Sequence, residues 1–138
     1  MRARHGTSAH TADLGLWVEA DSLPELFSAS ALALAELMVS GPRQGRVQWL
    51  PLDLRAGDRA ELLVELLNEV VFRLDAEGLI CVALEVEELG PDSLRGRLGL
   101  LPRDARHGPG EPVKAVTYHQ ARVEPLGPGW RAEVVMDV

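Results

Sequence analysis

The chain is poor in the features that several protein classes depend on. It has a single cysteine, Cys81, among 138 residues, so no internal disulfide can form. It contains no run of about 18 uninterrupted apolar residues, the length that a membrane-spanning helix needs. No apolar stretch follows the basic N-terminal residues, as a secretory signal would require. These absences predict a cytoplasmic protein without a membrane partner.

Positive charge is also scarce. The chain carries 14 lysines and arginines against 21 aspartates and glutamates, for a formal net charge of -7. Proteins that bind nucleic acids neutralise phosphates with lysine and arginine, and an acidic domain is repelled instead. The charge balance therefore argues against direct binding of DNA or RNA. We expect a protein partner, through which RNA is reached only indirectly.

Two helices are indicated by capping signals and by apolar residues at helical spacing. Ser22 followed by Glu25 forms the pattern of a reciprocal capping box at the start of the first helix. Ser40-Gly41-Pro42 is expected to end this helix after its apolar stripe. The second helix is predicted to begin at Asp58 and to end at Gly78. Both apolar stripes are wide enough to pack on a sheet.

The remaining segments alternate between apolar and polar residues and are predicted to form strands. They cover residues 14–19, 47–54, 80–86, 94–100, 113–124 and 130–138. Pro51 confines the second of these strands to a sheet edge or a bulge. The order of elements predicts one α+β domain over residues 1–138. We expect a two-layer sandwich with two helices on one face of a mostly antiparallel sheet.

Carboxylates gather near the end of the chain. Asp137 lies on the opposite strand face from Met136 and Val138 and is next to the C-terminal carboxylate. If the start of the first strand lies beside it, Asp13 adds a second carboxylate. Such oxygen ligands suit Ca²⁺ or Mg²⁺, whereas zinc is disfavoured because Cys81 is alone.

The same residues have ordinary structural interpretations. An aspartate at a strand end is commonly a turn or cap residue. His10 and His119 have the spacing of edge-strand histidines, and Lys114 of an exposed charge that protects a sheet edge. The spacing alone leaves both interpretations open.

Catalytic motifs are missing from the sequence. No glycine-rich phosphate loop leads into a helix, and no G-x-S-x-G segment is present. Two carboxylates with nearby histidines could activate a water molecule in a metal-dependent enzyme, but no nucleophile or phosphate cradle accompanies them. We expect a protein that is not an enzyme.

Several strings, in this order, resemble the archease family. The chain has His10-Thr11-Ala12-Asp13 before an apolar strand, an Ala- and Leu-rich helix ending in Leu37-Met38, and a Leu-Leu-Val-x-x-Leu-Asn-Glu core over residues 62–69. It continues with Val113-Lys114-Ala115-Val116-Thr117-Tyr118-His119 and ends on Asp137-Val138. It departs from the family at Leu66, where a tryptophan is common, and in the Gly- and Pro-rich loop over residues 103–112.

The resemblance implies an archease-like fold and a divalent metal site. The metal is expected to be Ca²⁺, with Mg²⁺ or Mn²⁺ as alternatives, and its ligands to be Asp13, Asp137 and Val138. His10, Lys114 and His119 are expected to frame the site.

The resemblance also implies a function. Archeases promote guanylylation and multiple turnover of an RtcB-type RNA ligase in tRNA splicing or RNA repair, and the ligase holds the guanylate and the catalytic metals. The alternative is a general chaperone or modulator of RNA-modifying enzymes such as tRNA methyltransferases. That alternative predicts stimulation that does not depend on the two aspartates.

Overall fold

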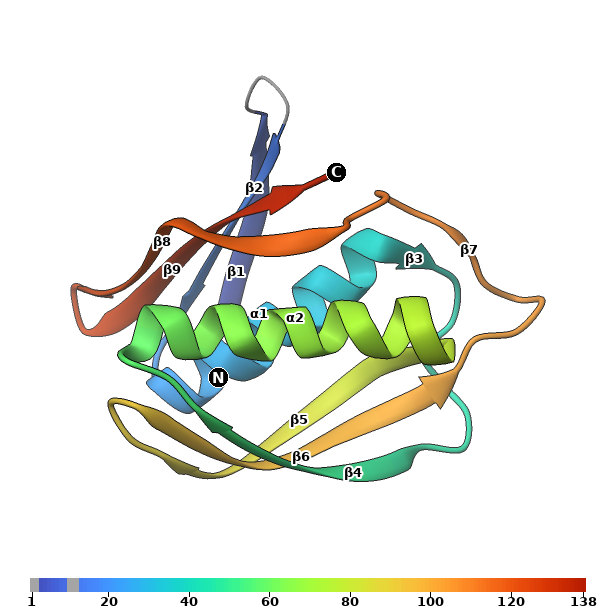
Figure 1. Ribbon diagram of the computed structural model, residues 1–138, viewed down its shortest axis with the longest axis horizontal. Helices are drawn as coiled ribbons and strands as arrows, with labels where there is room; N and C mark the ends of the chain where they lie inside the picture. Colours follow the sequence, from blue (N-terminus) through green and yellow to red (C-terminus); the bar gives the residue numbers. More distant parts are fainter. Residues whose placement is uncertain (1–2, 10–12) are drawn as a thin grey trace.

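The computed structural model describes residues 3–9 and 13–138 of the chain and contains two helices and nine strands within them (Figure 1). In chain order the elements are β1 (Ala3–Ala9), β2 (Asp13–Ala20), α1 (Leu23–Met38), β3 (Val39–Ser40), β4 (Gln48–Arg55), α2 (Arg59–Glu77), β5 (Leu79–Leu89), β6 (Ser93–Pro102), β7 (Gly108–Pro109), β8 (Ala115–Leu126) and β9 (Gly129–Asp137). Neither helix, over the part of the chain described, is long and apolar enough to span a membrane.

The longer strands form two antiparallel sheets. One has the order β1-β2-β9-β8 and the other the order β4-β6-β5, while the two-residue strands β3 and β7 pair with each other. The helices lie between the two larger sheets (Figure 1) and contact strands of both. The predicted α+β class, with two helices and antiparallel strands, is confirmed.

The division into two sheets differs from the single sheet face that the sequence predicted for the helices. The physical reason lies in α1, where Ala33, Leu34 and Ala35 are consecutive and all buried. Consecutive residues of a helix point in different directions, so a helix buried at all three must be covered on more than one side. The second sheet supplies that cover.

Both helices begin where the sequence predicts. The Ser22 hydroxyl accepts the Glu25 N–H at 3.3 Å, and the Asp58 carboxylate accepts the Glu61 N–H at 2.9 Å. At α2 the Glu61 carboxylate accepts the N–H of Gly57 at 2.8 Å, which is the residue before the N-cap Asp58, so the bond is not that of a reciprocal capping box. At α1 no bond from the Ser22 N–H to the Glu25 carboxylate is present among the described residues, and one carboxylate oxygen of Glu25 is buried without a hydrogen-bond partner.

Strand β1 was not predicted, although it pairs with β2 from Ala3 opposite Ala20 to Ala9 opposite Leu14. Its residues are largely polar and exposed, so no apolar alternation marks it as a strand. The expectation for Pro51 is confirmed, because β4 is an outer strand of its sheet, where a missing N–H leaves the ladder intact.

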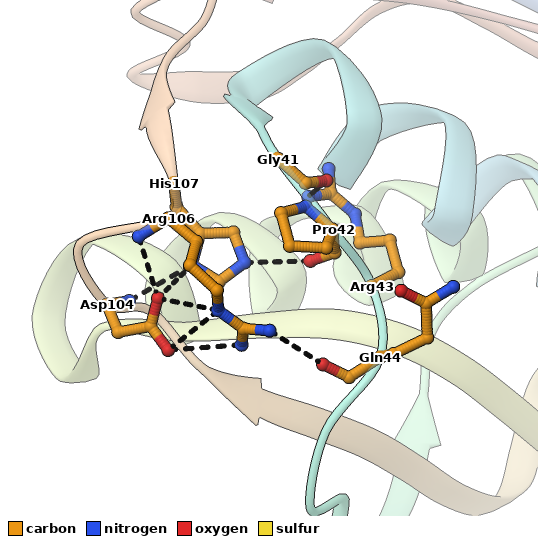
Figure 2. Close-up of polar contacts among 7 residues, drawn as sticks. All are labelled: Gly41, Pro42, Arg43, Gln44, Asp104, Arg106 and His107. Atoms are coloured by element: carbon orange, nitrogen blue, oxygen red, sulfur yellow. Dashed lines mark hydrogen bonds and ion pairs between the residues drawn. The ribbon is translucent and has the colours of Figure 1, made fainter.

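The loop over residues 103–112 is fastened through a buried histidine (Figure 2). The His107 Nδ1 accepts the Asp104 N–H at 3.0 Å, and its Nε2 lies 2.8 Å from the carbonyl oxygen of Pro42. A carbonyl can only accept, so the proton of the neutral ring resides on Nε2. Arg106 adds an ion pair with Asp104 at 3.1 Å and donates to the Gln44 carbonyl at 3.4 Å.

The same loop is joined to the end of α1. The Gly110 N–H donates to the Met38 carbonyl at 3.0 Å, and the Glu111 N–H donates to the Leu37 carbonyl at 2.9 Å. Arg43 donates to the carbonyls of Ala35 at 3.1 Å and Val39 at 2.6 Å, and so ties the segment after β3 to the end of the helix. The segment that enters β8 is therefore anchored before the strand begins.

Replacing His107 with phenylalanine tests this anchor. The variant keeps a ring of similar shape but loses both hydrogen bonds, so we expect the free energy of unfolding to fall by about 2 kcal/mol. Urea denaturation followed by tryptophan fluorescence measures the change. His119→Phe, at an exposed position, is the control and should stay within about 0.5 kcal/mol of the wild type. Equal stabilities of the two variants would contradict the anchoring role.

Candidate functional site

Two carboxylates face each other at one end of the four-stranded sheet. The register of β2 and β9 places Asp13 directly opposite Asp137, and that of β8 and β9 places Ala115 on the other side of Asp137. Directly opposed residues in an antiparallel pair point to the same face, with Cβ atoms about 4.5–5.5 Å apart. Figure 1 shows this end of β9, marked C, beside β2. The predicted neighbourhood of the two aspartates is therefore present in the fold.

The negative charges of the two carboxylates are not neutralised by the ion pairs of the described residues. Like charges directly opposite on a sheet repel each other. Within residues 3–9 and 13–138, the ion pairs involve neither Asp13 nor Asp137. A cation between them would remove the repulsion, and Asp137 is exposed enough for one to enter.

The donors around the pair fit a hard cation. The Thr117 Oγ1 is buried without a hydrogen-bond partner. Thr117 lies opposite Val135, two residues along β9 from Asp137, and is therefore on the same face of the sheet as the acidic pair. With the two aspartates and the main-chain oxygen of Val138, every donor is an oxygen, as Ca²⁺ and Mg²⁺ prefer. Histidine, cysteine, aspartate and glutamate side chains do not form a metal-binding group of three or more in the described residues. Main-chain oxygens and water would therefore have to complete the coordination.

The single cysteine does not support a zinc site. Cys81 lies on β5, in the other sheet, and is buried. Burial raises the pKa of its thiol to about 11, because the apolar surroundings disfavour the charged thiolate. The thiol is therefore protonated at neutral pH and is a poor metal ligand.

The three residues expected to frame the site lie in different places. Lys114, the only lysine of the chain, is exposed beside the pair, and its N–H donates to the Asp137 carbonyl at 2.8 Å. His119 lies farther along β8, in an irregular stretch between Thr117 and Arg122, and is not brought to the pair. His10 lies outside the described residues.

Asn68 is a site residue that the sequence did not identify. Its Nδ2 donates to the Val116 carbonyl at 2.9 Å, and its Oδ1 accepts the Val116 N–H at 2.8 Å. Strand β8 is at the edge of its sheet, so this amide takes the place of a neighbouring strand. The bonds hold β8 one residue from Ala115, which lies opposite Asp137. The signal in the sequence was a polar residue among the apolar residues of α2. Its partner lies 48 residues away, so the sequence alone could not identify it.

Beyond the pair, the outer face of the four-stranded sheet carries a balanced charge cluster, in which Arg4 and Arg131 are paired with Glu19 and Glu133. Arg131 contacts Glu133 at 3.0 Å and Glu19 at 2.5 Å, and these hydrogen bonds raise the pKa of its guanidinium. Its guanidinium also lies 4.9 Å from the ring centre of Trp17. Because these charges form ion pairs with one another, the cluster contributes to the stability of the sheet. The acidic pair is then the part of this face where a cation could bind.

These observations define a small α+β protein in which two helices lie between antiparallel sheets and the last strand ends in an oxygen-rich acidic site. Residues 6–138 match the model of the Archease protein family (MTH1598/TM1083). The chain belongs to this family, so the resemblance found in the sequence is confirmed.

Individual relatives agree with the family match. The chain is 34% identical to protein archease of Pyrococcus furiosus over 134 residues, which cover 94% of each chain. It is 35% identical to protein archease of Methanopyrus kandleri over 133 residues, 94% of this chain and 95% of the relative.

Solved structures share the fold. The solution structure of Methanobacterium thermoautotrophicum protein 1598 aligns with a TM-score of 0.73 and 25% identity, over 97% of this chain and 98% of that one. The crystal structure of an archease from Thermotoga maritima, described as a possible chaperone, aligns with a TM-score of 0.64 and 18% identity, over 100% and 98% of the two chains. At that identity the second likeness concerns the fold alone.

Replacing Asn68 with alanine tests the link between α2 and β8. Both polar groups of Val116 lose their partner, so we expect the free energy of unfolding to fall by about 1–3 kcal/mol. Hydrogen exchange at the Val116 amide should also become faster. Asn68→Asp keeps the acceptor for that N–H and should lie between alanine and wild type. An unchanged exchange rate in Asn68→Ala would show that the side chain does not hold the strand.

Proposed function

We propose that the protein is a non-catalytic activator of an RtcB-type RNA ligase, which promotes guanylylation and multiple turnover of that ligase in tRNA splicing or RNA repair. Membership of the archease family supports the proposal. The observation that carries it to this chain is the pairing of Asp13 with Asp137 across β2 and β9, because the resemblance assigns the metal to these two aspartates.

In this proposal the acidic pair binds a divalent cation, Ca²⁺ in the first place, with Mg²⁺ and Mn²⁺ suited to the same oxygen donors. The bound ion would supply a positive charge that oxygen donors of the partner can share. Asp13 and Asp137 orient the site, and a main-chain oxygen of Val138 completes it. Lys114 adds a cationic group at the rim, fixed through its backbone bond to Asp137.

The net charge suits a partner of opposite sign. An RNA ligase presents a basic cleft to its substrate, and an acidic protein approaches such a surface faster than a neutral one does. The charge of -7 on this chain therefore favours encounter with the ligase over encounter with RNA.

A chaperone-like role is the second candidate, favoured by the description of the Thermotoga maritima protein as a possible chaperone. It uses the same surface and differs in one respect: stimulation of the partner should then persist without the two aspartates.

Removing the acidic pair separates the two candidates. We expect Asp137→Ala and Asp13→Ala to lower stimulation of ligase guanylylation by at least about tenfold, since loss of a metal-site residue has effects of that size. Labelling of the ligase with GTP and substoichiometric amounts of each variant measures it, with repeated RNA joining as a second readout. Asp53→Ala, an exposed carboxylate on β4, is the control and should stimulate like the wild type. Full stimulation by the site variants would favour the chaperone role.

Metal binding has a test that does not involve the ligase. A ligand that binds only the folded state at a hundred times its Kd raises the free energy of unfolding by about 2.7 kcal/mol. We expect Ca²⁺ to stabilise the wild type in this way and a chelator to reverse the effect, as measured by thermal unfolding. Asp13→Asn should show no such shift, and an equal shift in the variant would place the ion elsewhere.

A further inference from the structure

Two exposed aromatic side chains lie along the line where α2 meets β8. Phe72 is 51% exposed and Tyr118 is 55% exposed, although rings of this size are mostly buried in folded proteins. The two elements are joined by the Tyr118 hydroxyl, which donates to the Glu65 carboxylate at 2.9 Å, and by the two bonds between Asn68 and Val116.

The order of these contacts shows that α2 and β8 run in opposite directions, because Glu65 meets Tyr118 and Asn68 meets Val116. Phe72 follows Asn68 by four residues, about one helical turn, and so lies in the same row of the helix. It is therefore level with the first residues of β8. We call this row, formed by Glu65, Asn68, Phe72, Val116 and Tyr118, the α2–β8 seam.

The seam ends at the acidic site. Lys114 is two residues before Val116, and its N–H donates to the Asp137 carbonyl. Figure 1 shows α2 running below β8 with its near side uncovered by any other element. The seam therefore leads along β8 to the residues that pair with Asp137 on β9.

Both rings are held in position before any partner arrives. The bond to Glu65 raises the pKa of Tyr118, so the phenol is neutral and remains the donor. Arg73 lies 5.4 Å from the ring centre of Phe72 and is held at 2.7 Å by both Glu69 and Glu77. Side chains that are already ordered lose little entropy on binding, which is the property of an interface anchor.

The charge around the seam indicates which class of partner can bind there. Helix α2 carries five carboxylates against two arginines. The charge repels a nucleic acid and attracts a protein surface rich in lysine and arginine.

We propose that the α2–β8 seam is the docking face for the ligase, that Phe72 and Tyr118 are its anchors, and that the ligase receives them in apolar pockets bordered by basic side chains. The inference rests on the proposed function and deepens it by naming the face that docks. Other exposed apolar residues fit less well, because Trp49 lies on β4 in the other sheet and Leu126 lies at the far end of β8 from the acidic site.

The test is the affinity of the full chain for the purified RtcB-type ligase, measured by isothermal titration calorimetry. We expect Phe72→Ala and Tyr118→Ala each to weaken Kd by about 30-fold, the effect of losing an anchor residue. Trp49→Ala is the matched control, an aromatic residue that is 40% exposed on the other sheet, and should bind like the wild type. Tyr118→Phe keeps the ring and loses the bond to Glu65, so it should bind more tightly than Tyr118→Ala.

Stability and Ca²⁺ titration of each variant distinguish docking from folding and from the metal site. Because both rings are about half exposed, the free energy of unfolding should stay within about 1 kcal/mol of the wild type, with the lost Tyr118–Glu65 bond as the larger effect, and Ca²⁺ affinity should be unchanged. Wild-type affinity in the Phe72→Ala and Tyr118→Ala variants, or a loss confined to Trp49→Ala, would overturn the seam while the proposed function stands. Failure of the wild type to bind the ligase would overturn the proposed function, and the docking face with it.

Discussion

The antiparallel ladder between β2 and β9 is the constraint on which the rest of the structure depends. It runs from Asp13 opposite Asp137 to Ala20 opposite Trp130, and so joins the second strand of the chain to the last. On its inner face Leu16 and Val134 are buried against the helices. A slip of one residue would turn these side chains toward solvent, so core burial fixes the register. The register in turn fixes the distance between the two carboxylates. The acidic site is thus a consequence of the core.

Strand β8 completes the site, and it is held from both sides. On one side it pairs with β9, and on the other the Asn68 amide supplies the partners that an edge strand lacks. Before the strand begins, the His107 anchor and the bonds to the end of α1 fix the incoming loop. Lys114 lies between these fixed points, so its backbone position beside Asp137 is set by contacts on either side of it.

The parts of the fold that depend on neighbouring residues were predictable from the sequence. Ser22, Asp58 and Gly78 mark helix ends through bonds and dihedral angles within one turn, and the structure has them in those roles. Pairing between distant segments was not predictable in the same way. Strand β1 carries no apolar signal, since its partner β2 determines it. The strand faces placed Asp137 on the outer side, but its position opposite Asp13 follows only from the ladder. For the same reason the Asn68 amide could not be assigned a partner.

The seam and the acidic pair divide the proposed work between two kinds of group. Solvated carboxylates contribute little net affinity, because binding removes water that already stabilises them. Exposed rings contribute more, because their burial releases ordered water at little cost in side-chain entropy. A protein that docks through Phe72 and Tyr118 can therefore present Asp13 and Asp137 to its partner without using them for adhesion. Under these two proposals, release would depend on the seam and activation on the acidic pair, an arrangement that would allow one activator to serve many ligase molecules in turn.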